Sequence, residues 1–378
     1  MDRIRKFIVS NKDVLFCFLG SKLLFAAVLL IVRTPYSEVL GFFDAGHYRD
    51  IASMGYYVDG VTVFFPVIPL IIRYLGDVGL IVINQISYIT ALYFLKQILI
   101  KLKGEGKVPT VLSIAAVSPL ALFTSLEYTE SIYFMLTIIA FYLFVNDKLP
   151  ALMGIILGLS VATRNTGSML FFAIFTGYVI RMITENNKGK RIKDIFLCFV
   201  PATAISLIYP VYLQIKFNNW KVFMDAQYTY WVRIPSNIFK TVFTSLEVIF
   251  TNKYQFDGAV DTLVLFKINE VLSLGFMILV IVLIVREILI MRRQGRINIP
   301  SIVAIIYCAL FIVALGMTIR DPNIDCPTDS FYRYYLTLFP VYLGIGRLKE
   351  RGIQLFMFGS IILTMITCPA FCMGGFFF

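Results

Sequence analysis

Charged residues are scarce in this sequence. Of its 378 residues only 15% are Asp, Glu, Lys or Arg, whereas 59% are hydrophobic. Soluble domains contain about 25% charged and roughly 45–50% apolar residues. The composition therefore excludes a water-soluble globular protein. The net charge of +11 does not indicate nucleic-acid binding, because the basic residues form short clusters between apolar runs, such as Lys101–Lys103 and Lys188–Arg191.

Residues and motifs for binding metals or nucleotides are few. The sequence has one histidine, and its six cysteines are scattered without Cys-x-x-Cys spacing, so no metal centre is expected. Asp-x-Asp, through which nucleotide-sugar enzymes often hold a metal and a diphosphate, does not occur. The glycine-rich dinucleotide pattern and the P-loop are absent as well. These absences argue against a nucleotide-sugar donor, and no cofactor is expected.

Linkers and internal repeats are also missing. No stretch rich in Gly, Pro or Ser divides the chain, and there is no repeat of the kind that many transporters carry. A single membrane domain over residues 1–378 is therefore expected.

Long hydrophobic runs are abundant. A bilayer-spanning helix needs about 20 mostly apolar residues, and such runs recur along the whole chain. They predict an all-α polytopic membrane protein with about eleven transmembrane helices. The spans are expected near residues 14–33, 79–100, 108–125, 131–146, 151–164, 168–183, 195–215, 271–290, 300–319, 334–347 and 353–373.

The basic clusters orient these spans. Cytoplasmic loops carry an excess of Lys and Arg, and every basic cluster is cytoplasmic when Met1–Lys6 is. Residues 34–78 and 216–269 then form two long outer loops. Within them, 64–75 is expected in or re-entering the outer membrane surface, and 238–250 as a juxtamembrane helix in the interface. We expect a prokaryotic cell membrane with the site outside, or the endoplasmic reticulum membrane with a lumenal site if the protein is eukaryotic.

Polar side chains in the first outer loop predict a site. Such groups are costly in a membrane protein unless they face a cavity or water. Asp44, His47 and Arg49 follow the first span, and in a helix Asp44, His47 and Tyr48 share one face. Arg49 is a candidate for substrate binding, although the polar side that any helix on the membrane surface needs would also explain it. Asp44, which follows two phenylalanines, is a candidate for a functional role.

Further polar residues stand at the outer ends of other spans. They are Glu127 and Glu130, Arg164, Gln227 and Arg233, and Arg333 with Tyr334. An arginine on the outer side needs an anionic partner. The arginines therefore predict a shared anionic ligand, which the surrounding residues would help to bind. The alternative is that each arginine forms a structural ion pair with a nearby carboxylate.

A sugar esterified to polyprenyl phosphate would match these features. Its tail would lie in the bilayer, its phosphate at the interface and its sugar in an aqueous cavity. Transfer of the sugar to an acceptor hydroxyl needs a base, for which Asp44 is the first candidate and His47 the second. The arginines would stabilise the charge of the leaving phosphate. A base opposite that phosphate predicts inversion at the anomeric centre.

Several short motifs occur in one order along nearly the whole chain. They are Phe43-Asp44-Ala45-Gly46-His47-Tyr48, Met54-Gly55-Tyr56, Phe64-Phe65-Pro66-Val67-Ile68-Pro69, Ser118-Pro119, Tyr128-Thr129-Glu130-Ser131, Thr163-Arg164-Asn165-Thr166-Gly167, Phe223-Met224-Asp225-Ala226-Gln227 with Trp231-Val232-Arg233, and Arg333-Tyr334-Tyr335-Leu336 with Phe339-Pro340. In this order they resemble the PIG-V type mannosyltransferases, which belong to the GT-C membrane glycosyltransferases.

The resemblance implies a GT-C fold, polyprenyl or dolichyl phosphate mannose as donor, and an acid in the first outer loop as base. That acid is Asp44, preceded by Phe43 where the family often has tryptophan. The family motif positions are further matched by Glu130, Arg164, Gln227, Arg233 and Arg333. The chain is more similar to the prokaryotic relatives, whose acceptors vary. The expected partners are therefore membrane lipids, a polyprenyl-phosphate-linked sugar and a glycan or glycolipid acceptor.

Two other hypotheses fit the same composition. A transporter or flippase of lipid-linked sugar would share the basic interfacial residues but would need no base, and the missing repeats argue mildly against it. A GT-C relative that moves another sugar, or that catalyses a ligase-type reaction, would differ only in its sugar pocket.

Overall fold

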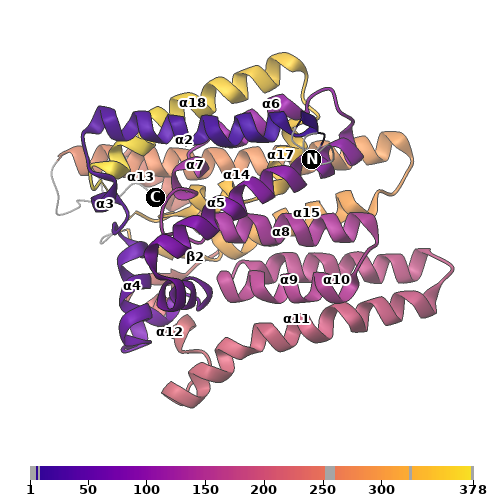
Figure 1. Cartoon of the computed structure of the whole chain (residues 1–378), viewed down its shortest axis with the longest axis horizontal. Helices are drawn as coiled ribbons and strands as arrows, with labels where there is room; N and C mark the ends of the chain where they lie inside the picture. The colour runs from indigo at the N-terminus through magenta and orange to yellow at the C-terminus, as the bar shows by residue number, and fades with distance from the viewer. Residues whose placement is uncertain (1–5, 7–8, 252–259, 323–325, 376–378) are drawn as a thin grey trace.

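The computed structural model describes residues 6, 9–251, 260–322 and 326–375, and within these ranges the chain is almost entirely helical. Met1–Arg5 and residues 252–259 of the second expected outer loop lie outside the described residues. Figure 1 shows most of the long helices running side by side along one direction.

Among the described residues, 7 helices are long and apolar enough to cross a membrane. They are α2 (Lys12–Val32), α5 (Val67–Lys103), α10 (Gly167–Thr184), α11 (Lys188–Phe217), α14 (Val260–Gln294), α15 (Ile299–Gly316) and α18 (Glu350–Cys372). Shorter apolar helices are α6 (Val108–Val117), α8 (Glu130–Asn146) and α9 (Pro150–Thr163). The expected all-α, multi-pass membrane architecture is thereby confirmed, while the count of about eleven spans stays a prediction.

Two expected spans are interrupted. The span near 108–125 divides into α6 and α7 (Leu120–Phe123) around Pro119. The span near 334–347 divides into α16 (Phe331–Leu336) and α17 (Phe339–Ile345), with Pro340 in the first turn of α17. Proline lacks a backbone donor and disfavours a helical residue before it. Helices therefore restart at these prolines.

Segment 64–75 is helical from Val67 and forms the beginning of α5. Gly76 then has φ 71° and ψ 177°, which is readily accessible only to glycine. The two parts of α5 consequently meet at a break directly before Asp77. The placement of this segment at the outer membrane surface stays a prediction.

Helix α8 lies at the centre of the bundle. Almost all of its side chains are buried, the polar Glu130, Ser131 and Thr137 among them. A helix that is apolar all round is buried on every side, and α8 packs against both α5 and α9. It thus places the carboxylate of Glu130 inside the protein.

Helices α9 and α11 approach closely through glycines. A Cβ at Gly154 would lie 2.0 Å from the carbonyl oxygen of Cys198, and one at Gly158 would lie 2.7 Å from Cβ of Ile205. Small residues four apart allow helix backbones to meet in membranes. This contact fixes α11 against the middle of the bundle.

The short elements gather at one end of the long helices. They include α3 (Tyr36–Val39), α4 (Asp44–Met54) and the 3₁₀ turn η1 (Asp59–Val63), followed by α12 (Val222–Thr229), β1 (Arg233–Pro235), α13 (Ile238–Phe250) and β2 (Thr318–Arg320). Figure 1 shows α3, α4 and α12 at the left, which we name the α4 end. It shows the beginning of α2 and the α10–α11 and α14–α15 connections at the opposite end.

The expected juxtamembrane helix 238–250 corresponds to α13. Several of its apolar side chains are exposed and several of its polar side chains are buried, the reverse of a helix on the surface of a water-soluble protein. Phe239, Phe243 and Phe250 are exposed, whereas Thr241 and Thr244 are buried. An outward apolar face of this kind fits a helix that lies in a membrane interface.

An ion-pair network joins α8, α10 and α11 at the opposite end. Asp147, which follows α8, receives contacts from Arg181 at 3.0 Å and from Lys190 at 2.8 Å, and it also pairs with Arg191. Burial favours a higher pKa for Asp147, but the hydrogen bonds from Arg191 and Lys190 and the nearby guanidiniums outweigh it and lower the pKa to about 2. The network therefore stabilises the fold far from the α4 end.

Candidate functional site

Asp44 is the first residue of α4, directly after a residue with unusual backbone angles. Phe43 has φ 52° and ψ −119°, and its ring packs against Phe42 and Phe371. A carboxylate in the first turn interacts favourably with the helix dipole. The expected helix with Asp44, His47 and Tyr48 on one face is present, and all three residues line a common cavity.

This cavity lies at the α4 end and has a volume of about 870 Å³. Its walls come from α4, the loop after η1, the α9–α10 turn, α12, the β1–β2 ribbon and α16. The predicted site residues that line it are Asp44, His47, Arg164, Gln227, Arg233, Arg333 and Tyr334. Residues from four separate parts of the sequence are thereby brought together around one space of ligand size.

Two arginines and two carboxylates form a network on the α4 side of the cavity. Arg333 donates from Nη2 to Oδ2 of Asp44 at 2.8 Å, and its Nε lies 3.3 Å from Oε1 of Glu130. Arg164 donates from Nη1 to the same Glu130 oxygen at 2.8 Å. Glu130 is completely buried and does not line the cavity. A buried carboxylate needs compensating charges, so Glu130 holds both guanidiniums in position.

Aromatic rings support these guanidiniums. The Arg164 guanidinium lies 4.4 Å from the ring centre of Tyr334, and that of Arg333 lies 5.5 Å from the ring centres of Phe123 and Tyr128. Guanidiniums stack favourably on aromatic faces. The rings thus restrict how far either arginine can turn away from its carboxylate.

A second arginine pair lies on the β1–β2 ribbon. Arg233 and Arg320 are opposite each other in the antiparallel register, and both line the cavity. The Asp329 carboxylate lies 3.7 Å from Nη2 of Arg233 and 3.2 Å from Nη2 of Arg320. One acid therefore contacts both guanidiniums of the ribbon.

The segment that carries Asp329 is anchored to α14. Glu270 accepts hydrogen bonds at Oε1 from the thiol of Cys326 at 2.7 Å and from the backbone N–H of Thr328 at 2.8 Å. Glu270 and Cys326 are fully buried. This anchor fixes the position of Asp329, which follows Thr328 directly.

Three aromatic rings that contact one another line the cavity, and we name them the aromatic wall. His47 stacks on Phe64 with ring centres 4.8 Å apart, and Trp231 meets both rings almost at right angles at 5.5 and 5.4 Å. The indole N–H of Trp231 donates to the carbonyl oxygen of Gly60 at 2.9 Å. Nδ1 of His47 is buried and has no hydrogen-bond partner among the described residues. The wall is rigid and offers apolar ring surface to the cavity.

Arg49 and Glu127 contact each other and do not line the cavity. Nε and Nη2 of Arg49 donate to the two oxygens of Glu127 at 2.7 and 2.6 Å, and Asp77 lies 3.5 Å from Nε. Burial raises the pKa of Glu127 above its ordinary value, although the hydrogen bonds from Arg49 oppose this. The pair ties α4 to the turn before α8, and direct substrate binding by these two residues stays a prediction.

Three of the non-glycine residues with positive φ in the described part of the chain lie at the cavity or next to residues that line it. Phe43, Val232 and Ser330 have φ values of 52°, 51° and 66°, a region that is costly for residues other than glycine and most of all for β-branched valine. Phe43 precedes Asp44, Val232 joins Trp231 to Arg233, and Ser330 follows Asp329. The strained positions thus adjoin residues of both arginine groups and of the aromatic wall.

Sequence reasoning missed Arg320 as a cavity residue, and it assigned no role to Trp231. Thr318 and Ile319 were expected to complete the span near 300–319, and Arg320 follows them directly. The sequence did contain a signal, because Arg320 is one more arginine at the expected outer end of an apolar run, like Arg164. Trp231 stands two residues before Arg233, within a motif already selected.

The described part of the chain contains no candidate metal-binding cluster. No three His, Cys, Asp or Glu side chains come together there as a metal-binding group. The acids nearest the cavity, Asp44, Glu130 and Asp329, each contact arginine. Activity without metal stays a prediction for an assay.

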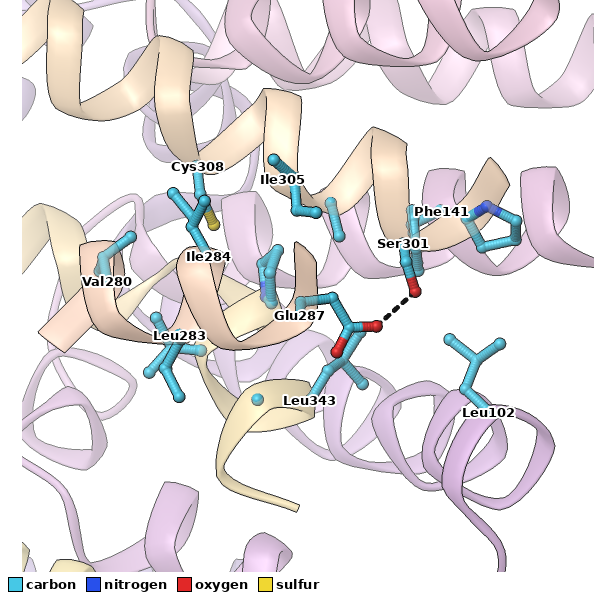
Figure 2. A pocket seen from close by; sticks show the side chains of 15 residues that line it. Leu102, Phe141, Val280, Leu283, Ile284, Glu287, Ser301, Ile305, Cys308 and Leu343 are labelled. Atoms are coloured by element: carbon cyan, nitrogen blue, oxygen red, sulfur yellow. Dashed lines mark hydrogen bonds between the residues drawn. The ribbon is translucent and has the colours of Figure 1, made fainter. Parts of the chain in front are cut away.

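Another, much smaller pocket lies among α5, α8, α14, α15 and α17. Figure 2 shows Glu287 of α14 pointing toward Ser301 of α15 among apolar side chains such as Leu102 and Leu343. The Ser301 hydroxyl donates to Glu287 at 2.6 Å, and Arg347 donates to the same oxygen at 2.8 Å. The volume of about 50 Å³ is enough for about one or two water molecules. This pocket is too small for a sugar.

Comparisons with known proteins give distant structural similarities. No family model matches the chain, and no curated protein matches it. The chain is similar to ArnT from Cupriavidus metallidurans bound to undecaprenyl phosphate, with 12% identity and a TM-score of 0.47 over 91% of this chain and 63% of that one. It is also similar to the apo oligosaccharyltransferase of Archaeoglobus fulgidus, with 13% identity and a TM-score of 0.48 over 96% of this chain and 55% of that one. This chain covers less than two thirds of either protein.

Proposed function

We propose that this protein is a membrane glycosyltransferase of the GT-C type that moves a sugar from a polyprenyl-phosphate-linked donor to a lipid or glycan acceptor. One observation carries the proposal. The Asp44 carboxylate lies in the wall of a large cavity that is also lined by four arginines, Arg164, Arg233, Arg320 and Arg333. A base and several fixed cations around one space suit the transfer of a sugar away from a phosphate.

The reaction is a single displacement. Asp44 accepts the proton of the acceptor hydroxyl while that oxygen bonds to the anomeric carbon. The bond from the anomeric carbon to the phosphate oxygen breaks, and its electron pair leaves with the phosphate. Guanidiniums held in position in the cavity wall stabilise the charge that develops there. Attack from the side opposite the phosphate inverts the anomeric centre, so a β-linked donor yields an α-linked product.

Mannose as the sugar and an extracytoplasmic site are part of the proposal. Mannose rests on the resemblance of the ordered motifs to the PIG-V type mannosyltransferases. The orientation is supported by the positive-inside rule, because the basic residues of the α10–α11 and α14–α15 connections lie at the end opposite the cavity (Figure 1). The whole chain, residues 1–378, then acts as one catalytic membrane domain.

The test is sugar transfer by purified protein in lipid nanodiscs. Labelled mannose should move from polyprenyl phosphate mannose to an endogenous lipid or glycan fraction without added metal. Asp44→Asn should lower the rate by about 10²–10⁴-fold, the usual contribution of a general base, without loss of folding. Asp50→Asn, which changes an exposed acid of the same helix, is the matched control and should retain activity.

Two outcomes would contradict the proposal. Full activity in Asp44→Asn would remove Asp44 as the base. Movement of intact polyprenyl phosphate mannose across a vesicle membrane, with no transfer to any acceptor, would identify a flippase instead.

A further inference from the structure

The four cavity arginines fall into two groups with different surroundings. Arg164 and Arg333 contact the carboxylates of Glu130 and Asp44 at 2.8 to 3.3 Å. Arg233 and Arg320 contact Asp329 and come from a different wall, the β1–β2 ribbon. The two groups therefore suit different roles.

The ribbon places two guanidiniums side by side. Residues directly opposite in an antiparallel pair point to the same face and have Cα atoms about 4.5–5.5 Å apart. Like charges in that arrangement are unfavourable, yet Arg233 and Arg320 occupy it and both side chains are only 11% exposed. Two neighbouring forks of N–H donors on one surface are well suited to the oxygens of a phosphate.

The stereochemistry of a single displacement separates the base from the leaving group. The base must lie on the acceptor side of the anomeric carbon, and the phosphate must leave from the other side. An anion bound to Arg333 would compete with Asp44, whose Oδ2 is already 2.8 Å from Nη2 of Arg333. The phosphate is consequently better placed on arginines that do not hold the base.

We propose that Arg233 and Arg320 bind the phosphate of the lipid-linked donor, whereas Arg164 and Arg333 position Asp44. This inference rests on the proposed function and divides its arginines into binding and positioning residues. It assigns a ligand contact to Arg320.

The aromatic wall connects the two groups and places the sugar between them. His47, one turn after Asp44, lies 5.5 Å from Trp231, and the Arg320 guanidinium lies 5.9 Å from the Trp231 ring centre. His47 and Trp231 thus connect α4, which carries Asp44, to the ribbon. A pyranose ring in front of Trp231 has the base on one side and the phosphate-binding arginines on the other.

Binding of polyprenyl phosphate, the donor without its sugar, tests the division without requiring any transfer. The dissociation constant is measured with purified protein in nanodiscs. Arg320→Gln and Arg233→Gln should each weaken binding at least tenfold. Arg320→Lys should weaken it less, because it keeps the charge and loses the fork. Arg333→Lys should change it by less than threefold while lowering the turnover of the complete donor.

Arg73→Gln is the matched control, since Arg73 is an exposed arginine of α5 outside the cavity. The affinity of this variant for polyprenyl phosphate should stay within twofold of that of the wild type. Inorganic phosphate should compete with polyprenyl phosphate only at much higher concentration. If the protein bound both with equal affinity, the proposal that the ligand is lipid-linked would be contradicted. Wild-type binding that Arg320→Gln leaves unchanged would overturn the division while the proposed function stands. No binding of polyprenyl phosphate by the wild type would overturn both.

Discussion

Arg333 and Asp44, which are 289 positions apart in the chain, are joined by a hydrogen bond of 2.8 Å between Nη2 and Oδ2. The same guanidinium lies 3.3 Å from the fully buried Glu130. A residue of α16 therefore sets the orientation of a carboxylate on α4, while its charge also compensates an acid inside the bundle.

Arg333→Lys should separate these two contributions. Lysine keeps the positive charge near Glu130, so the midpoint of thermal unfolding should fall by only a few degrees. A single ammonium cannot hold both carboxylates in fork geometry, so kcat should fall at least tenfold with little change in KM. Steady-state transfer assays and thermal unfolding in detergent measure both effects. Proportional losses of stability and activity would instead assign Arg333 a purely structural role.

The Arg49–Glu127 pair should show an asymmetric response to mutation. Arg49→Met leaves the fully buried carboxylate of Glu127 without its bidentate partner and should lower the free energy of unfolding by about 2 kcal/mol or more. Glu127→Gln leaves Arg49, which is 35% exposed and near Asp77, able to reach water, so the loss should be about half as large. Chemical unfolding of the single and double variants completes the cycle. Additive losses would mean that the two side chains do not interact.

Gly154→Ala tests the close packing of α9 and α11. The added methyl group would meet the carbonyl oxygen of Cys198 at 2.0 Å, a backbone atom that moves only if the helices separate. Overpacking of this kind costs roughly 1–3 kcal/mol, and the yield of monodisperse protein should fall. Gly275→Ala in α14 is the control, because nothing lies within 4 Å of the new methyl group. Equal behaviour of the two variants would show that the contact is not tight.

Asp147 should make the stability of the end opposite α4 dependent on pH. Its pKa is lowered from 3.8 to about 2, so the folded state favours the ionised form by up to about 2 kcal/mol. That stability is fully present above about pH 4 and is lost as the pH falls toward 2. Unfolding measured between pH 6 and 2 should show the loss in the wild type and a smaller one in Asp147→Asn. If the stability of Asp147→Asn depended on pH in the same way as that of the wild type, the role of Asp147 in the network would be contradicted.

The long helices could be predicted because the bilayer fixes their length and composition. The expected span 14–33 corresponds to α2 at Lys12–Val32, and 168–183 corresponds to α10 at Gly167–Thr184. The break within 334–347 was not predicted, since apolar residues continue across it. The start of α17 depends instead on Pro340 and on how α16 packs against α14.

The candidate site was predictable where single residues were out of place. Arg164 and Arg333 stand at apolar runs on the expected outer side, where cations are rare, and Asp44 follows aromatic residues. Arg320 was hidden because β1 and β2 have three residues each, too few for an alternating pattern to indicate a strand or its register. The pairing of Arg49 with Glu127 depends on the tertiary packing of α4, which no local pattern encodes.

The assembly of the cavity from α4 and α16 has a consequence for biosynthesis. At about 5–20 residues per second, Arg333 leaves the ribosome roughly 15–60 s after Asp44. During that interval α4 has been synthesised and the helices from α5 to α15 are inserted. Asp44 has no contact with Arg333 until α16 follows. A chain interrupted before α16 therefore holds most of the scaffold but lacks the hydrogen bond that orients Asp44. If Asp44 is the base, as proposed, synthesis must pass α16 before the site can act.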